Sequence, residues 1–243
     1  MFDALGMMAR GRPMMPTAVL DRPMISGFRT AMRLHKSVLA AQEKRVLIWL
    51  AERTPEWVNS DHLTILGFAG QIGTGVCYGM SRFNRFWLLG AIGCLALNWF
   101  GDSLDGTLAR VRQKQRPRYG FYVDHILDSI GSVGLMAGLA VSGYMSPFVA
   151  LGLLVAFLLL SIQSYLATYT LGEFQMSFWS FGPTELRILL AIGNLVVLRW
   201  PYVLHGHRLF DVGGIVGIVG MSGMLVFFTA RNIRRLYCEE QVR

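Results

Sequence analysis

Four aspartates lie inside two strongly apolar parts of the chain, within the stretch GDSLDGTLARVRQKQRPRYGFYVDHILDSI that starts at Gly101. Asp102 and Asp105 lie near the end of one apolar run, and the next run passes straight through Asp124 and Asp128. A carboxylate at membrane depth is expensive, and it persists mainly where it binds an ion, a proton or a substrate. These acids therefore indicate a site for chemistry and favour a fold that brings both pairs to one cavity.

The composition is that of a membrane protein. Hydrophobic residues make up 53% of the chain and charged residues 16%, whereas a soluble domain has about 25% charged residues. A helix that crosses a bilayer needs about 20 residues. Six apolar segments have this length, at roughly residues 62–81, 86–108, 120–143, 147–171, 185–204 and 212–231. We therefore expect an all-α integral membrane protein with six transmembrane helices, and a soluble protein with buried helices is a poor alternative.

Lys and Arg are distributed unevenly between the two ends of these segments. Eighteen lie before the first span, after the second and after the sixth, whereas four lie in the opposite loops. By the positive-inside rule, both termini and the ends that carry the aspartates face the cytoplasm. Anionic membrane lipids and phosphate substrates account for the net charge of +8, so no nucleic-acid partner is expected.

The chain is expected to form one membrane domain preceded by two short segments. Residues 1–27 lack the continuous apolar core of a cleavable signal, and we interpret them as a flexible leader. Residues 28–58 alternate apolar with basic side chains, which is typical of an amphipathic helix at the cytoplasmic membrane interface. Residues 59–237 would form the six-helix domain, and residues 238–243 a cytoplasmic tail.

Glycines recur at helix-contact spacing in two of the spans. Gly134 and Gly138 form one pair, and Gly213 and Gly217 form another. Such pairs let two helices approach closely. Packing within the chain is our first interpretation, and a homodimer interface is the alternative.

The predicted topology brings the two acidic pairs to the same membrane depth. The second span ends on the cytoplasmic side, the third begins there, and a short basic loop joins them. On each helix the acids share one face with small residues. These residues are Asp102, Asp105, Gly106 and Ala109 on the second span, and Gly120, Asp124 and Asp128 on the third.

This set of side chains suits metal ions and phosphates. Carboxylate oxygens prefer hard divalent cations such as Mg²⁺ or Mn²⁺. Two such ions can clamp a diphosphate and stabilise both oxygens of an in-line phosphoryl displacement, and Arg110 can add bidentate contacts to phosphate. The alternative, that the acids only form ion pairs with the loop arginines, explains neither their membrane depth nor the glycines.

The motif resembles the signature of the CDP-alcohol phosphotransferase family, D-x2-D-G-x2-A-R followed after about eight residues by G-x3-D-x3-D. The matching positions are Asp102, Asp105, Gly106, Ala109, Arg110, Gly120, Asp124 and Asp128. Nine residues separate the two halves, one more than usual, and the extra residue falls in a loop. Six spans and an amphipathic leader helix also fit the family, so the resemblance covers roughly residues 28–237.

The resemblance implies a reaction and a role for each matched residue. A CDP-linked donor would bind in the cytoplasm-facing cavity, a hydroxyl would attack the phosphorus distal to cytidine, and CMP would leave. All four aspartates would hold the ions, two Mg²⁺ or Mn²⁺, and Asp128 would also activate the hydroxyl. Gly106 and Ala109 would leave space for the cytidine diphosphate, which Arg110 and Gly120 would also help to bind.

His125 and Glu185 are further candidates for the catalytic site. His125 follows Asp124, and Glu185 lies in FGPTE at the start of the fifth span. This stretch is similar to a segment in choline and ethanolamine phosphotransferases, a branch that also tends to place a His after the third Asp. A His oriented by a carboxylate is a natural general base near neutral pH. Alternatively, His125 is only a polar neighbour, and Glu185 pairs with Arg187 or Arg110.

The direction of transfer stays open at this point. The basic motif loop would suit a phosphorylated polar acceptor, so CDP-diacylglycerol is slightly ahead as the donor. A choline- or ethanolamine-type enzyme with diacylglycerol as acceptor is the alternative. An intramembrane prenyltransferase also uses Asp-rich motifs and Mg²⁺, but six spans are too few for it. A transporter or lipid-binding scaffold is the non-enzymatic alternative, and neither rival predicts a preference for cytidine.

Overall fold

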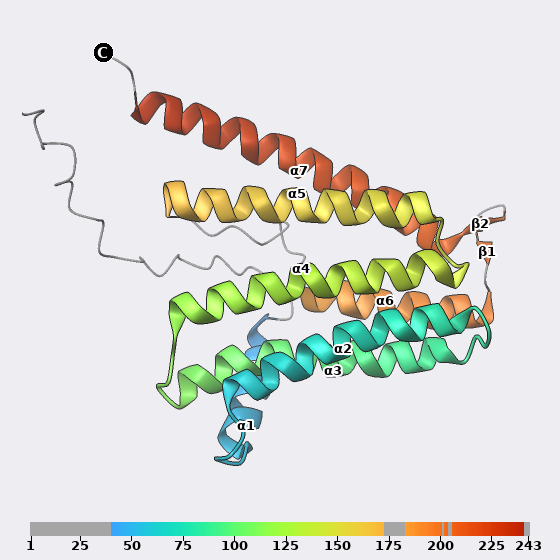
Figure 1. The fold of residues 1–243 in the computed structure, drawn as a ribbon, viewed down its shortest axis with the longest axis horizontal. Helices are drawn as coiled ribbons and strands as arrows, with labels where there is room; N and C mark the ends of the chain where they lie inside the picture. Colours follow the sequence, from blue (N-terminus) through green and yellow to red (C-terminus); the bar gives the residue numbers. More distant parts are fainter. Residues whose placement is uncertain (1–39, 173–182, 201, 204–205, 241–243) are drawn as a thin grey trace, which may run out of the picture.

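The computed structural model describes residues 40–172, 183–200, 202–203 and 206–240, most of them in helices (Figure 1). The elements in chain order are α1 (Ala40–Arg53), α2 (Ser60–Ser81), α3 (Trp87–Val111), α4 (Pro117–Ser142), α5 (Pro147–Leu171), α6 (Pro183–Arg199), β1 (Tyr202–Val203), β2 (His207–Arg208) and α7 (Leu209–Glu239). The two short strands form an antiparallel hairpin just before α7. Apart from this hairpin, the predicted all-α class is confirmed.

Five of the described helices, α2, α3, α4, α5 and α7, are long and apolar enough to cross a bilayer. They coincide with five of the six predicted spans and make this a multi-pass membrane protein. In the region of the predicted fifth span, α6 has 17 residues, somewhat fewer than the about 20 that a bilayer requires. The sixth transmembrane helix therefore stays a prediction.

Glycines allow α2 to pack against α3 and α4 with backbone touching backbone. A Cβ atom on Gly101 of α3 would lie 2.3 Å from the amide nitrogen of Gly67 on α2. One on Gly138 of α4 would lie 2.0 Å from the carbonyl oxygen of Gly75. Any larger side chain at these positions would push the helices apart, so the glycines let α3 and α4 lie close to α2. The close approach predicted at Gly138 is made within the chain.

α5 and α7 lie side by side along one edge of the molecule (Figure 1). A Cβ atom on Gly217 of α7 would lie 2.9 Å from Cδ1 of Leu153 on α5. Of the second predicted glycine pair, Gly217 thus contributes to packing within the chain, whereas a Cβ atom on Gly213 would meet nothing within 4 Å. The homodimer stays a prediction. α7 continues to Glu239, past the predicted end of the sixth span at about residue 231.

α1 packs against the ends of α2 and α3 that lie near the candidate site. Leu47 and Ala51 of α1 are buried together with Leu63, Leu104 and Leu108. The apolar face of α1 is therefore turned toward the bundle. Residues 28–39 of the predicted amphipathic segment lie outside the described residues, and the position of this segment at the membrane interface stays a prediction.

Arg112 fixes the end of α3 to the connection between α1 and α2. Its guanidinium donates hydrogen bonds to the carbonyl oxygens of Val58, Thr54 and Pro55 at 2.5, 2.7 and 2.9 Å. Backbone carbonyls in a turn need such partners, or water in their place. The chain then reverses over a short loop, and α4 begins at Pro117, a residue favoured in the first turn of a helix.

Candidate active site

A pocket between α2, α3 and α4 contains all four predicted aspartates. Asp102 and Asp105 reach it from α3, and Asp124 and Asp128 reach it from the first turns of α4. All four are half-buried. The residues that line the pocket are Thr64, Gly67, Phe68, Gln71, Asn98, Asp102, Asp105, Asp124, Leu127 and Asp128. The structure thus brings together the two acidic pairs that the sequence analysis expected to meet.

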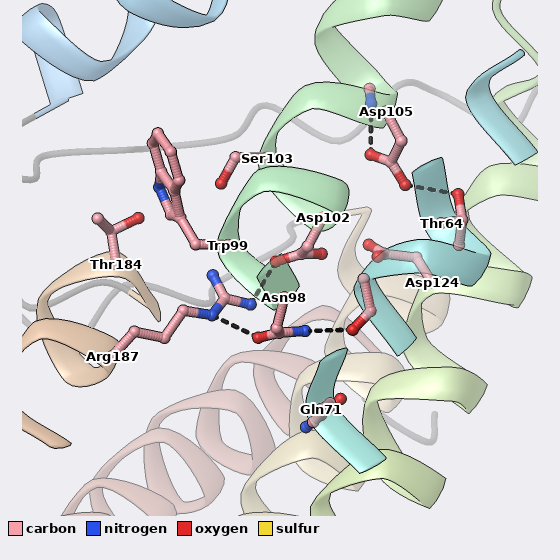
Figure 2. A network of polar contacts seen from close by, with 12 residues as sticks. Thr64, Gln71, Asn98, Trp99, Asp102, Ser103, Asp105, Asp124, Thr184 and Arg187 are labelled. Atoms are coloured by element: carbon pink, nitrogen blue, oxygen red, sulfur yellow. Dashed lines mark hydrogen bonds and ion pairs between the residues drawn. The ribbon is translucent and has the colours of Figure 1, made fainter. Parts of the chain in front are cut away.

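Asp105 is held by its own helix and by α2. Its Oδ2 accepts a hydrogen bond from the hydroxyl of Thr64 at 2.6 Å, and its Oδ1 accepts one from the amide of Gly106 (Figure 2). The Ser60 hydroxyl also donates to the Asp105 carbonyl at 3.1 Å. These bonds fix the carboxylate beside the pocket, so little rotamer freedom remains to be lost when a ligand binds.

Asp102 pairs with an arginine from a distant part of the chain. Arg187 on α6 donates from Nη2 to Oδ2 of Asp102 at 2.5 Å, and from Nε to Oδ1 of Asn98 at 2.7 Å (Figure 2). Asn98 in turn donates from Nδ2 to the carbonyl of Gly67 at 2.9 Å. Arg187 lies outside the sequence motif, and its contact with Asp102 was not predicted. The available signal was a basic residue inside a predicted span, which usually marks a functional position.

Asp124, His125 and Asp128 each offer one ligand atom, and these three atoms lie within 4.8 Å of one another. His125 is buried, and its Nδ1 lies 3.8 Å from Oδ2 of Asp124. Its ring stacks on Tyr165 with centroids 4.9 Å apart and meets the edge of Phe121 at 4.2 Å. The aromatic neighbours therefore fix the orientation of the imidazole next to the acids.

The small residues of the motif behave differently from the glycines that pack α2. A Cβ atom added to Gly120 would meet nothing within 4 Å, and one on Gly106 would meet only the Arg110 side chain at 3.5 Å. Packing within the chain therefore does not require a glycine at either position. Arg110 itself is exposed, and its Nη2 donates to the Thr107 hydroxyl at 3.0 Å. Open space of this kind suits a ligand that approaches the helix surface.

The group Asp124, His125 and Asp128 fits a divalent cation. Carboxylate oxygens bind hard divalent cations, and an imidazole nitrogen is a common ligand of divalent transition metals. Asp102 and Asp105 line the same pocket and add two further carboxylates. The arrangement can therefore hold a divalent metal ion, as the motif predicted.

Glu43 connects three helices near the site through contacts that the sequence did not predict. Its Oε1 accepts hydrogen bonds from Nε1 of Trp99 at 2.8 Å and from the hydroxyl of Thr184 at 2.8 Å. The carboxylate thus joins α1 to α3 and to the first turn of α6, which also carries the half-buried Glu185. The proposed pairing of Glu185 with His125 stays a prediction.

A family model described as CDP-alcohol phosphatidyltransferase matches residues 57–228, more than half of the chain. The matched region extends from just before α2 into α7 and includes every residue that lines the pocket. A comparison with curated proteins gave no match.

Proposed function

The chain belongs to the CDP-alcohol phosphatidyltransferase family, and on this premise we propose that it transfers a phosphatidyl group from CDP-diacylglycerol to the hydroxyl of a water-soluble alcohol. CMP is the second product, and two Mg²⁺ or Mn²⁺ ions assist the transfer. Family membership makes the chain a phosphotransferase of lipid biosynthesis that acts on a CDP-alcohol. The identity of the donor, the acceptor and the metal is our proposal.

One observation carries the proposal, namely that four carboxylates from two helices line a single pocket. Asp102, Asp105, Asp124 and Asp128 would together hold the ions. When bound, the ions would neutralise the diphosphate and stabilise the charge that develops during transfer. Packing within the chain gives no reason for the open space at Gly106 and Gly120, and we assign that space, with neighbouring Ala109, to the cytidine diphosphate.

Asp128 is proposed as the base. Its carboxylate would accept the proton of the acceptor hydroxyl, and the freed oxygen would attack the phosphorus distal to cytidine. A new phosphodiester bond forms as the bond to CMP breaks. Arg110, at the end of α3, would contact the phosphates, because a guanidinium binds phosphate through paired hydrogen bonds.

The membrane arrangement follows from the same proposal. We place α6 across the membrane as the sixth span, with both termini and the pocket on the cytoplasmic side, where water-soluble alcohols are found. The basic segment that includes α1 would lie at the membrane interface. A homodimer is compatible with this arrangement.

A preference for cytidine tests the proposed function. CDP or CMP should raise the unfolding temperature of the detergent-solubilised protein when Mg²⁺ or Mn²⁺ is present, and much less when the metal is chelated. UDP serves as the matched control because it carries the same diphosphate. Equal stabilisation by CDP and UDP would contradict the proposal and favour a general diphosphate site, as in a prenyltransferase. Transfer from CDP-diacylglycerol to a panel of labelled alcohols then identifies the acceptor.

The second candidate is a choline- or ethanolamine-type enzyme, in which His125 and Glu185 form the base and diacylglycerol is the acceptor. The proximity of His125 to Asp124 and Asp128 favours it. Under our proposal, His125→Ala and Glu185→Ala should each keep measurable transfer from CDP-diacylglycerol, within about tenfold of the wild type, because Asp128 is the base.

His125→Phe is the matched control for this test, because it keeps an aromatic ring between Phe121 and Tyr165. Rates are measured with saturating donor, and nucleotide binding is followed by thermal shift. If His125→Ala and Glu185→Ala each abolish turnover while CDP still binds, the choline- or ethanolamine-type assignment replaces ours.

A further inference from the structure

We propose that Arg187 is an internal counter-cation that opposes the binding of divalent metal to the acidic pocket until a diphosphate is present. This inference rests on the proposed function, since it concerns the same pocket. It assigns a role to a residue outside the sequence motif. The consequence is that metal and nucleotide bind in a coupled manner rather than independently.

Arg187 is held at the pocket by two partners. Its Nη2 lies 2.5 Å from Oδ2 of Asp102, and the two side chains are only 15% and 25% exposed. Its Nε donates to Oδ1 of Asn98 at 2.7 Å. Asn98 is 5% exposed, and its Nδ2 is bonded to the Gly67 carbonyl, which turns the amide oxygen toward the guanidinium. These contacts therefore hold the guanidinium in one position at this carboxylate.

This position places a fixed positive charge beside the acids that would bind the metal. Asp102 shares the pocket with Asp105, Asp124 and Asp128. The charge repels an incoming divalent cation, and the hydrogen bond occupies one of the two Asp102 oxygens. Both effects are strong at a poorly hydrated site, where charges are screened less than in bulk water. Metal affinity in the absence of nucleotide should therefore be lower than four carboxylates alone would give.

A diphosphate changes this balance. Phosphate oxygens offer a guanidinium two parallel, charge-assisted hydrogen bonds, and a bound metal ion can replace the guanidinium as the positive partner of Asp102. If Arg187 turns toward the phosphates, both oxygens of Asp102 become available to the metal. The nucleotide then favours metal binding, and the metal favours nucleotide binding by the same factor, because coupling between two ligands is reciprocal.

Removing the charge tests the inference by direct metal binding rather than by activity. The full-length protein in detergent is titrated with Mn²⁺, and free Mn²⁺ is measured by electron paramagnetic resonance with and without CDP. Arg187→Gln should bind Mn²⁺ at least about tenfold more tightly than the wild type without CDP, and the enhancement by CDP should shrink by a similar factor. Arg187→Met should act in the same direction, and its apolar side chain suits a helix with exposed apolar neighbours.

Arg235→Gln is the matched control. It removes the same charge from the end of α7, where Arg235 pairs with Glu239, and it should leave both Mn²⁺ affinities unchanged. Folded Arg187→Gln or Arg187→Met protein with unchanged or weaker Mn²⁺ binding overturns the inference. The inference is also overturned if CDP enhances Mn²⁺ binding as strongly in both variants as in the wild type. The proposed function fails separately, if the wild type itself binds neither Mn²⁺ nor CDP.

Discussion

Asp128→Asn should reduce transfer by at least about 10³-fold while CDP still raises the unfolding temperature in the presence of metal. Under our proposal this carboxylate removes the proton of the acceptor hydroxyl, and a general base contributes about 10²- to 10⁴-fold to a rate. Asparagine keeps the shape of the side chain but cannot accept the proton. Three carboxylates remain in the pocket to hold metal and nucleotide. Initial rates and thermal shifts on the same preparation check both parts.

Asp102→Asn and Asp124→Asn should behave differently from Asp128→Asn. Each removes a charge that holds the ions, so both metal dependence and CDP binding should weaken along with turnover. Asp61→Asn is a matched control, because Asp61 is an exposed acid that pairs with Arg116 outside the pocket lining. Exposed pairs contribute little to stability. Full activity in any of the three pocket variants would count heavily against the metal site.

Five of the six predicted spans coincide with long apolar helices, because length and hydropathy define such helices. The predicted first and fourth spans, at about 62–81 and 147–171, agree closely with α2 and α5. The predicted third span began near residue 120, but α4 begins at Pro117 because proline is well suited to the first helical turn. α7 continues past its predicted end because a helix need not stop where its apolar residues do.

The candidate site was predictable only where its residues are close in sequence. The spacing of the motif predicted that the acids from α3 and α4 share a pocket, since a short loop joins these helices. The contacts of Arg187 with Asp102 and of Glu43 with Thr184 link residues far apart in the chain. No local pattern specifies such partners. The roles of the motif residues came from the family resemblance, and they stay predictions.

The glycines give a test that separates folding from binding. Gly138→Ala should destabilise the protein by about 3 kcal/mol or prevent its folding, because overpacking of a tight contact costs about 1–3 kcal/mol and sometimes more. The new Cβ would lie 2.0 Å from the carbonyl oxygen of Gly75, and backbone on both sides leaves no flexible side chain to move. The yield of folded protein and its unfolding temperature in detergent measure this effect.

Gly120→Ala makes the same chemical change where the chain leaves open space, so the unfolding temperature without ligand should not fall. Its Cβ would instead enter the region that we assign to cytidine diphosphate, and stabilisation by CDP should be reduced. Gly93→Ala is the control for both, because a Cβ there also meets nothing within 4 Å and Gly93 lies in the first half of α3, before the motif begins. Gly93→Ala should keep the unfolding temperature and the CDP binding of the wild type, since alanine favours a helix by up to about 1 kcal/mol over glycine.

If Gly120→Ala binds CDP as the wild type does, the nucleotide does not occupy the space beside the start of α4. If Gly138→Ala is as stable as Gly93→Ala, α2 and α4 are not packed as closely as the structure indicates, and the convergence of the four aspartates loses its physical basis.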